Sequence, residues 1–206
     1  AYGSFGARAT GVISPGIDGR HPDMSAYFPT RDVEKAKELL AEAGYPDGFE
    51  TSISCNSSDQ QRKDFCEVVQ AQLAEVGITL KIDVMDSTQW ASSLAAGEGY
   101  MTIYGLTAST GEAGRVLFRW LPDTSEWPIS SWDNQEYYDL INKALATTDT
   151  QERNELYYRC QEMLMENHVV LPVWHKELNA ACQLDVRGFR ITPSYEQHYL
   201  QFVYFE

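Results

Sequence analysis

The chain has 206 residues, and 43% of them are hydrophobic, which is typical of one large globular domain or of one domain and part of another. Its 30 acidic and 16 basic residues give a formal net charge of −14, which argues against nucleic acid and against an anionic membrane surface as partners. No run of about 18 apolar residues occurs, so we expect no membrane-spanning helix.

The first part of the sequence is irregular in pattern. It begins with Ala1 rather than Met and carries no signal-peptide pattern, so we expect a fragment or a processed product. Residues 11–30 are rich in glycine and proline, which predicts a long irregular segment. A helix follows, because apolar residues recur at helical spacing from Val33 to Ala43 and the glycines and proline of residues 43–48 end it.

Strands and helices then alternate along the chain. Strictly alternating apolar residues mark the strand over 78–86, and apolar faces at helical spacing mark the helices. Ser58 or Asp59 caps the helix over 58–77, and Ser87 opens the next helix. We predict strands over 49–55, 78–86, 100–106, 168–175, 178–184 and 199–206, and helices over 58–77, 87–98, 113–121, 137–145 and 156–164. This order predicts an α/β fold with a mixed sheet flanked by helices.

Residues that bind metals or catalyse reactions form no known motif. The four cysteines are Cys55, Cys66, Cys160 and Cys182, and the four histidines are His21, His168, His175 and His198. The cysteines form no CxxC pair, which argues against structural zinc; a buried free thiol explains Cys66, and disulfide pairing stays open. The histidines form no HxxH or HExxH pattern, and GxSxG and phosphate-loop motifs are absent. We therefore predict no metal site, no cofactor and no enzyme activity.

Residues 104–117, YGLTASTGEAGRVL, lead from a predicted strand through small hydroxyl residues into a helical stretch. Loops in this position often bind ligands. Glu112 either contacts a ligand or is a helix N-terminal carboxylate stabilised by the helix dipole, and Ser109 and Thr110 either bond a ligand or cap a turn. Arg115 pairs either with a ligand carboxylate or with Glu112, three residues away on the same helix.

Three blocks of the sequence occur together in one protein family. They are ATGVISPGIDG followed by RDVEKAKELLAEAGYPDGFE, then AQLAEVGITLKIDVMDSTQW, and then DNQEYYDLINKALATTDTQERNELYYRCQEML leading to VLPVWHKELNAACQLDVRGF. Together they resemble the C-terminal half of the family 5 solute-binding proteins of bacterial ABC importers. Members of this family bind dipeptides, oligopeptides, nickel or glutathione. The resemblance covers essentially the whole chain.

The resemblance implies one lobe of a two-lobed, type II (cluster C-like) periplasmic binding protein, with the ligand in the cleft between lobes. Residues 1–183 would form the C-terminal ligand-binding lobe, and residues 184–206 would return to an N-terminal lobe absent from this chain. The implied function is binding of a small peptide or peptide-like ligand for the permease subunits, in the periplasm or lipid-anchored at the cell surface. Alternatives are a sensory receptor that signals without transport, and a receptor for glutathione or a metal chelate.

The loop differs from that of dipeptide-binding members. Gly105 matches the family glycine, Leu106 replaces the tryptophan after it, and Ser109 stands where an aspartate binds the ligand's amino group. Glu112 keeps the second acidic position, and residues 109–113 resemble the glutathione-type members. A hydroxyl cannot replace a carboxylate as a charge partner, so this loop disfavours a plain dipeptide ligand.

Tryptophans outside the predicted elements are the last candidates for the site. A single tryptophan usually packs in a core, but Trp127 and Trp132 lie in a predicted loop, which favours a contact with the ligand or the other lobe. Main-chain and hydroxyl hydrogen bonds with wet side-chain pockets would give loose sequence selectivity. The predicted ligand-binding residues are Tyr104, Leu106, Thr107, Ser109, Thr110, Glu112, Arg115 and Trp127.

Overall fold

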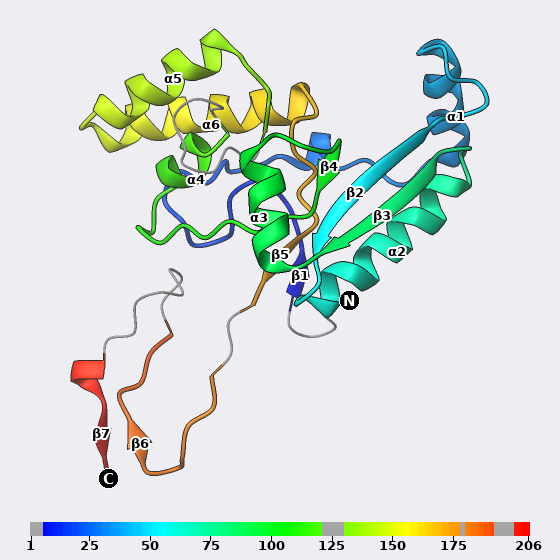
Figure 1. Cartoon of the computed structure of the whole chain (residues 1–206). Coiled ribbons are helices and arrows are strands. Elements are labelled where there is room, and N and C mark those ends of the chain that lie inside the picture. Colours follow the sequence, from blue (N-terminus) through cyan, green and yellow to red (C-terminus); the bar gives the residue numbers. More distant parts are fainter. Residues whose placement is uncertain (1–5, 121–129, 178–179, 192–199) are drawn as a thin grey trace. The chain divides into compact units, whose positions relative to one another are not determined.

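The computed structural model describes residues 6–120, 130–177, 180–191 and 200–206. The chain divides into two compact units (Figure 1). The first unit is Pro29–Gly105, and the second contains the described parts of 6–28, 106–120 and 130–206. No helix within these described ranges combines the length and the apolar character that crossing a membrane requires.

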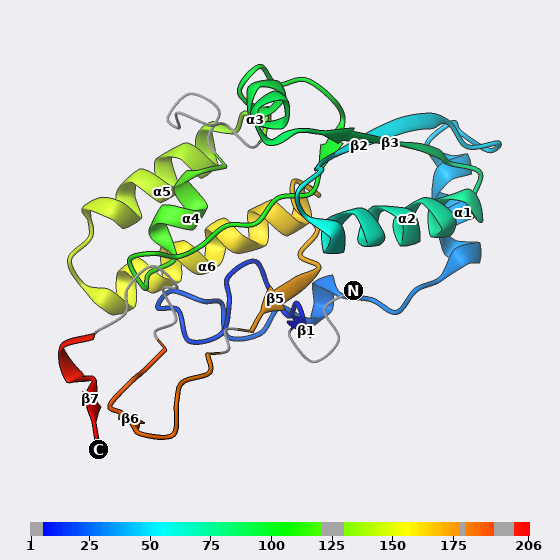
Figure 2. The same cartoon turned by 60° about the horizontal axis from the view of Figure 1, so that its bottom comes forward.

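A parallel three-stranded sheet forms the centre of the first unit. In the order β3-β2-β4, its strands are β2 (Glu50–Asn56), β3 (Thr79–Met85) and β4 (Met101–Thr102). Parallel neighbours need a crossover, and the two crossovers contain α2 (Gln60–Ala74) and α3 (Ser87–Ala95). Helix α2 lies along β2 and β3 in both views (Figure 1 and Figure 2), and α1 (Val33–Glu42) precedes β2. The carboxyl ends of the three strands therefore meet at one edge of the sheet.

Polar side chains cap the longer helices. The N-cap residues of α1, α2, α3, α5 (Gln135–Ala146) and α6 (Thr150–Glu166) are Asp32, Asp59, Asp86, Asn134 and Asp149. Each side chain accepts a first-turn backbone N–H, which stabilises a helix by about 1 kcal/mol. Asp59 is thus the cap of α2, and α3 begins at Ser87, as predicted, with Asp86 as its cap. The Asp86 side chain accepts the N–H groups of Thr88 and Gln89.

The core of the first unit lies between the sheet and α2. Ile53 and Cys55 of β2, Leu80 of β3 and Cys66 of α2 are buried, as the alternating pattern and the helical face predict. The predicted apolar faces of β3 and α2 also include Val84 and Val68, yet these are 51% and 54% exposed. Strand β3 is an edge strand, and the sheet has three strands among the described residues. The sheet is therefore too narrow to bury the whole apolar face of β3 or of α2.

Helices α5 and α6 form the centre of the second unit. They are joined by residues 147–149 and lie side by side in both views (Figure 1 and Figure 2). The short helix α4 (Gly114–Phe118) packs against both. Fully buried side chains at this contact are Leu117, Tyr137, Ile141, Tyr157 and Leu164, which confirms most of the two predicted apolar stripes.

A strand pair and an irregular segment complete this part of the second unit. β1 (Gly6–Arg8), which the sequence pattern did not predict, pairs antiparallel with β5 (Trp174–Lys176). The irregular segment predicted for residues 11–30 is confirmed, apart from the short 3-10 helix η2 (Ser25–Tyr27). It buries Ile13, Ile17 and Met24, so it belongs to the core despite its lack of regular structure.

All three strands predicted near the C-terminus were wrong in extent. His168, in the left-handed region at φ 53°, belongs to the turn after α6, so strand β5 begins six residues later than predicted, at Trp174. Residues 180–184 of the predicted strand 178–184 are not a strand. The tail has η3 (Leu200–Phe202) and an antiparallel pair of β6 (Val186–Arg187) and β7 (Tyr204–Phe205). The α/β class is confirmed, with parallel and antiparallel strands in separate sheets.

Candidate functional site

The predicted ligand-binding residues are divided between the two units. Tyr104 is near the end of the first unit, where its ring stacks on that of Trp90 with 5.4 Å between centroids. Residues 106–115 belong to the second unit and form its candidate site. Trp127 lies outside the described residues.

Main-chain hydrogen bonds fix the loop of residues 106–113 against the irregular segment. The N–H of Gly111 donates to the Ala108 carbonyl at 2.9 Å, which closes a turn that Gly111 completes at φ 75°. The N–H of Asp18 donates to the Gly111 carbonyl at 3.0 Å, and the N–H of Ala113 donates to the Asp18 carbonyl at 2.8 Å. Asp18 and Glu112 therefore form a single parallel bridge that holds the loop in one position.

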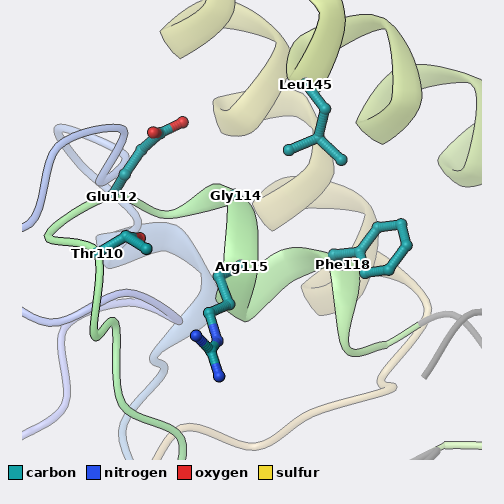
Figure 3. A pocket seen from close by; sticks show the side chains of 6 residues that line it. All are labelled: Thr110, Glu112, Gly114, Arg115, Phe118 and Leu145. Carbon is teal, nitrogen blue, oxygen red and sulfur yellow. The ribbon is translucent and has the colours of Figure 1, made fainter. Parts of the chain in front are cut away.

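Glu112 is bonded to α6 rather than to its own helix. Its Oε1 accepts the Tyr157 hydroxyl at 2.5 Å and lies 3.4 Å from the Arg153 Nε. The predicted local pair with Arg115 was wrong, because the two side chains leave the chain in opposite directions (Figure 3). Among the described residues, Arg115 forms no ion pair.

Two glycines enclose the Tyr157 side chain. A Cβ at Gly19 would stand 2.6 Å from the Tyr157 ring, and a Cβ at Gly114 would overlap the Tyr157 hydroxyl. Tyr157 is fully buried, and this burial, followed by its bond to Glu112, raises the pKa of the hydroxyl well above its ordinary value of 10.0. The hydroxyl therefore stays protonated and donates to Glu112 over the physiological pH range.

Arg153 lies near two carboxylates, those of Glu112 and Asp18. It is 3.4 Å from the Glu112 Oε1 and 3.8 Å from the Asp18 Oδ2, and its side chain is 20% exposed. Asp18 also accepts the side-chain amide of Asn154 and the N–H of Gly19, both at 3.0 Å. One guanidinium thus offsets part of the charge of two neighbouring carboxylates.

A buried glutamine of α6 also bonds the irregular segment of residues 11–30. Gln161 is fully buried; its Nε2 donates to the Gly19 carbonyl at 2.8 Å and its Oε1 accepts the His21 N–H at 3.2 Å. The His21 Nε2 in turn lies 3.2 Å from the Glu162 Oε1. Tyr157, Arg153 and Gln161 were all missed by the sequence analysis. The only signal in the sequence was weak: these polar residues lie at helical spacing beside the apolar stripe predicted for residues 156–164.

A pocket of about 270 Å³ lies beside the loop and is walled by α4 and α5 (Figure 3). Its lining residues are Thr110, Glu112, Gly114, Arg115, Phe118 and Leu145. Phe118 and Leu145 supply apolar surface, while Thr110 and Arg115 are exposed polar side chains at the loop. This combination suits a ligand that presents an apolar group together with hydrogen-bonding or anionic groups.

The hydroxyl residues of the loop are not equivalent. Thr107 and Thr110 are exposed, and Leu106 is half-buried. Ser109 is 9% exposed, and its Oγ is buried without a hydrogen-bond partner among the described residues. Thr107 and Thr110 are therefore accessible to a ligand in this conformation, whereas the Ser109 hydroxyl is covered.

The carboxyl edge of the parallel sheet carries a second polar cluster, in the first unit. Asn56, at the end of β2, donates through Nδ2 to the Ser87 hydroxyl at 3.0 Å, and Ser58 donates to the Asn56 Oδ1 at 2.8 Å. The Arg62 Nε lies 3.1 Å from the Asp59 Oδ2. The Arg62 Nη2 lies so near Gly105 that a Cβ at this glycine would be 3.0 Å from it. Ligands bind at this edge in open α/β sheets, so strand ends were a usable signal that the sequence analysis did not take up.

Metal-binding side chains do not gather anywhere in the described residues: no group of three or more His, Cys, Asp or Glu is placed to hold an ion. His175 Nδ1 lies 3.2 Å from the Ser14 hydroxyl, and burial followed by the charge of Arg20 lowers its pKa. His198 lies outside the described residues.

Solved structures share this architecture. HbpA2 from Haemophilus parasuis superposes with a TM-score of 0.83 at 28% identity, covering 100% of this chain and 41% of that protein. A dipeptide-binding protein from Pseudoalteromonas sp. SM9913, solved in complex with Met-Leu, superposes with a TM-score of 0.80 at 24% identity and shares the fold. The predicted fold, one lobe of a periplasmic binding protein, is confirmed.

Sequence comparison gives the same family. The glutathione-binding protein GsiB of Escherichia coli (strain K12) is 32% identical over 205 residues, which are 94% of this chain and 39% of that protein. The chain thus spans about two fifths of the length of the curated relatives it matches. Residues 1–127 match the family described as bacterial extracellular solute-binding proteins, family 5 Middle. The chain belongs to the family 5 bacterial extracellular solute-binding proteins.

Proposed function

We propose that this chain is one lobe of the substrate-binding component of an ABC importer for peptides or peptide-like molecules. The observation that carries the proposal is the fixed loop of residues 106–113, with exposed hydroxyls and a cation beside an apolar pocket, in a member of this family. A ligand that touches both lobes stabilises the closed form, which the permease subunits recognise. The protein acts outside the cytoplasm, in the periplasm or lipid-anchored at the cell surface.

The loop contributes one wall of the binding cleft. Thr107, Thr110 and Arg115, with the free main-chain groups of the loop, offer hydrogen bonds and one positive charge to the ligand. Tyr104, Leu106 and Trp127 belong to the same proposed set and supply apolar and aromatic surface. Ser109 joins this set if the loop rotates its covered hydroxyl toward the ligand, and Glu112 is treated below.

The C-terminal segment, residues 184–206, serves the contact with the N-terminal lobe in this proposal, and residues 1–183 form the ligand-binding lobe. Support comes from apolar side chains that the described chain leaves exposed. Leu184 is 93% exposed and Phe205 is 73% exposed, and the exposed set also contains Leu200, Phe202 and Tyr204. The gathering of large exposed apolar side chains on one short segment supports a contact with another protein surface.

Glutathione is the second candidate ligand, because the relatives named above include glutathione-binding proteins at 32% identity. The experiment is calorimetric titration of the longest natural protein that contains this chain, with trialanine and with reduced glutathione, after native mass spectrometry of what co-purifies. We expect binding of at least one of these two probes. Binding of neither probe, with no peptide-like molecule co-purifying, would contradict the proposal.

The same titration on residues 1–206 alone tests the two-lobed cleft. We expect the affinity to fall more than about 100-fold, because a ligand in contact with one wall buries much less of its surface. Tight binding by the 206-residue chain alone would overturn the two-lobed account while leaving the ligand class intact.

A further inference from the structure

We infer that Glu112, Tyr157 and Arg153 form a brace that positions the loop of residues 106–113, and that this loop therefore has no free carboxylate for a ligand's amino group. The inference rests on the proposed function, because it assigns which loop groups remain for the ligand. Tyr157 and Arg153 act through the loop and are positioning residues.

The first argument for the brace is steric. The Tyr157 ring is fully buried and is approached on its two sides by Gly19 of the irregular segment and by Gly114 at the start of α4. A side chain at either glycine would displace the ring. Two segments distant in sequence thus pack closely around one tyrosine of α6. The loop of residues 106–113, which is bonded to Asp18 and ends at Gly114, is held in position by this packing.

The second argument is the hydrogen bonding of Glu112. Its Oε1 accepts the Tyr157 hydroxyl at 2.5 Å and lies 3.4 Å from the Arg153 Nε. The backbone of Glu112 is fixed on both sides, through the Gly111 carbonyl and the Ala113 N–H that both bond to Asp18. Moving this carboxylate to a ligand would break a buried tyrosine's bond and leave Arg153 with a more distant partner, Asp18 at 3.8 Å.

The third argument is the acid content of the loop. Residues 104–115 contain one acidic residue, Glu112. The Ser109 hydroxyl carries no charge and is covered. With Glu112 committed to α6, the loop supplies a ligand with hydrogen bonds and the Arg115 cation. It therefore recognises the backbone or the anionic groups of a peptide-like ligand and is indifferent to whether its amino terminus is free or acylated.

Amide hydrogen exchange tests the brace without any ligand. The reporters are the N–H groups of Asp18, Gly111 and Ala113, and the variants are Tyr157→Phe and its matched control Tyr137→Phe. Tyr137 is also fully buried, but its hydroxyl donates to the Leu117 carbonyl at 2.7 Å rather than to the loop. We expect Tyr157→Phe to speed exchange at the three reporters roughly 10- to 30-fold, as the loss of one buried bond to a carboxylate allows. Equal exchange in the two variants would overturn the brace.

Binding of trialanine and N-acetyl-trialanine to the longest natural protein tests the consequence for the ligand. We expect Glu112→Gln and Tyr157→Phe each to weaken both peptides by the same factor, since each variant loosens the loop as a whole. A loss confined to free trialanine in Glu112→Gln would overturn the inference, because it would show that Glu112 binds the amino group. If the unmodified protein binds neither peptide, the proposed ligand class fails, and the exchange result still decides on the brace.

Discussion

Two irregular segments of the second unit are held in opposite ways. The loop of residues 106–113 is bonded by its main chain to Asp18 and by Glu112 to α6, so its contacts lie within the described chain. The described residues of the C-terminal segment, 184–191 and 200–206, are joined by the short β6-β7 pair and an ion pair of 2.7 Å between Arg187 and Glu206, and they expose large apolar side chains. The difference indicates that the loop is shaped before a ligand arrives, whereas the C-terminal segment leaves large apolar side chains exposed.

Substitution of a glycine packed against the brace is expected to give the largest effect. Gly19→Ala should lower the free energy of unfolding for two reasons. An alanine at φ 78° costs about 1 kcal/mol, and overpacking against the Tyr157 ring costs about 2 kcal/mol more. Gly16→Ala is the matched control, because Gly16 has φ 82° and open space around its Cβ position, so it should cost about 1 kcal/mol. Chemical denaturation of both variants measures the difference. Equal costs would show that Tyr157 yields freely and that the loop is not shaped around it.

Removal of one hydroxyl is expected to act less strongly. Tyr157→Phe should lower the free energy of unfolding by about 2 kcal/mol, because a buried bond to a carboxylate is lost. Tyr137→Phe loses a buried bond to a neutral carbonyl and should cost about 1 kcal/mol. Denaturation midpoints of the two variants test this order. The reverse order would contradict a charged acceptor at Glu112.

The buried thiols predict how stability depends on alkaline pH. Burial raises the pKa of Cys66 and of Cys160 to about 12, from an ordinary value of 9.0. Above pH 9 the unfolded chain releases these protons while the folded chain keeps them, so the free energy of unfolding should fall as pH rises, by at most about 1.4 kcal/mol per pH unit for each thiol. Cys160→Ala should reduce this slope, whereas substitution of the exposed Cys182 by serine should leave it unchanged. An unaltered slope in Cys160→Ala would contradict the assignment.

The C-terminal segment should give the smallest effect in this chain. Phe205→Ser should change the free energy of unfolding by about 0.5 kcal/mol or less, because the side chain is 73% exposed. In the longest natural protein the same change should cost about 2 kcal/mol, the transfer free energy of a phenylalanine that a partner surface covers. Denaturation of both proteins measures the pair. Equal small costs would remove the argument that this segment contacts another lobe.

Much of the fold could be predicted because its causes are local in sequence. Helical spacing placed α5 and α6, and one capping residue, Asp59, set the start of α2. Residues 180–184 were predicted to belong to a strand and do not. An apolar run forms a strand only when another strand pairs with it. β1 was missed for the converse reason: its three residues are a strand because β5 lies beside them.

The sequence indicated which loop is the candidate site, and that assignment stays a prediction; it did not indicate how the loop is held. The hydroxyl-rich sequence and the family resemblance both indicated residues 104–115. They could not show that Glu112 bonds a tyrosine 45 residues away, since no spacing rule joins a loop to a distant helix. The role of Gly19 was hidden for the same reason, because it depends on the ring that packs against it.

The most direct test of this account is the crystal structure of the longest natural protein that contains this chain, with its co-purified ligand bound. The account predicts a peptide-like ligand between two lobes, in contact with the main chain of residues 106–110 or with Thr107, Thr110 or Arg115. It also predicts that Glu112 keeps its hydrogen bond from Tyr157 and its ion pair with Arg153. A ligand remote from this loop, or a Glu112 carboxylate turned onto the ligand's amino group, would contradict it.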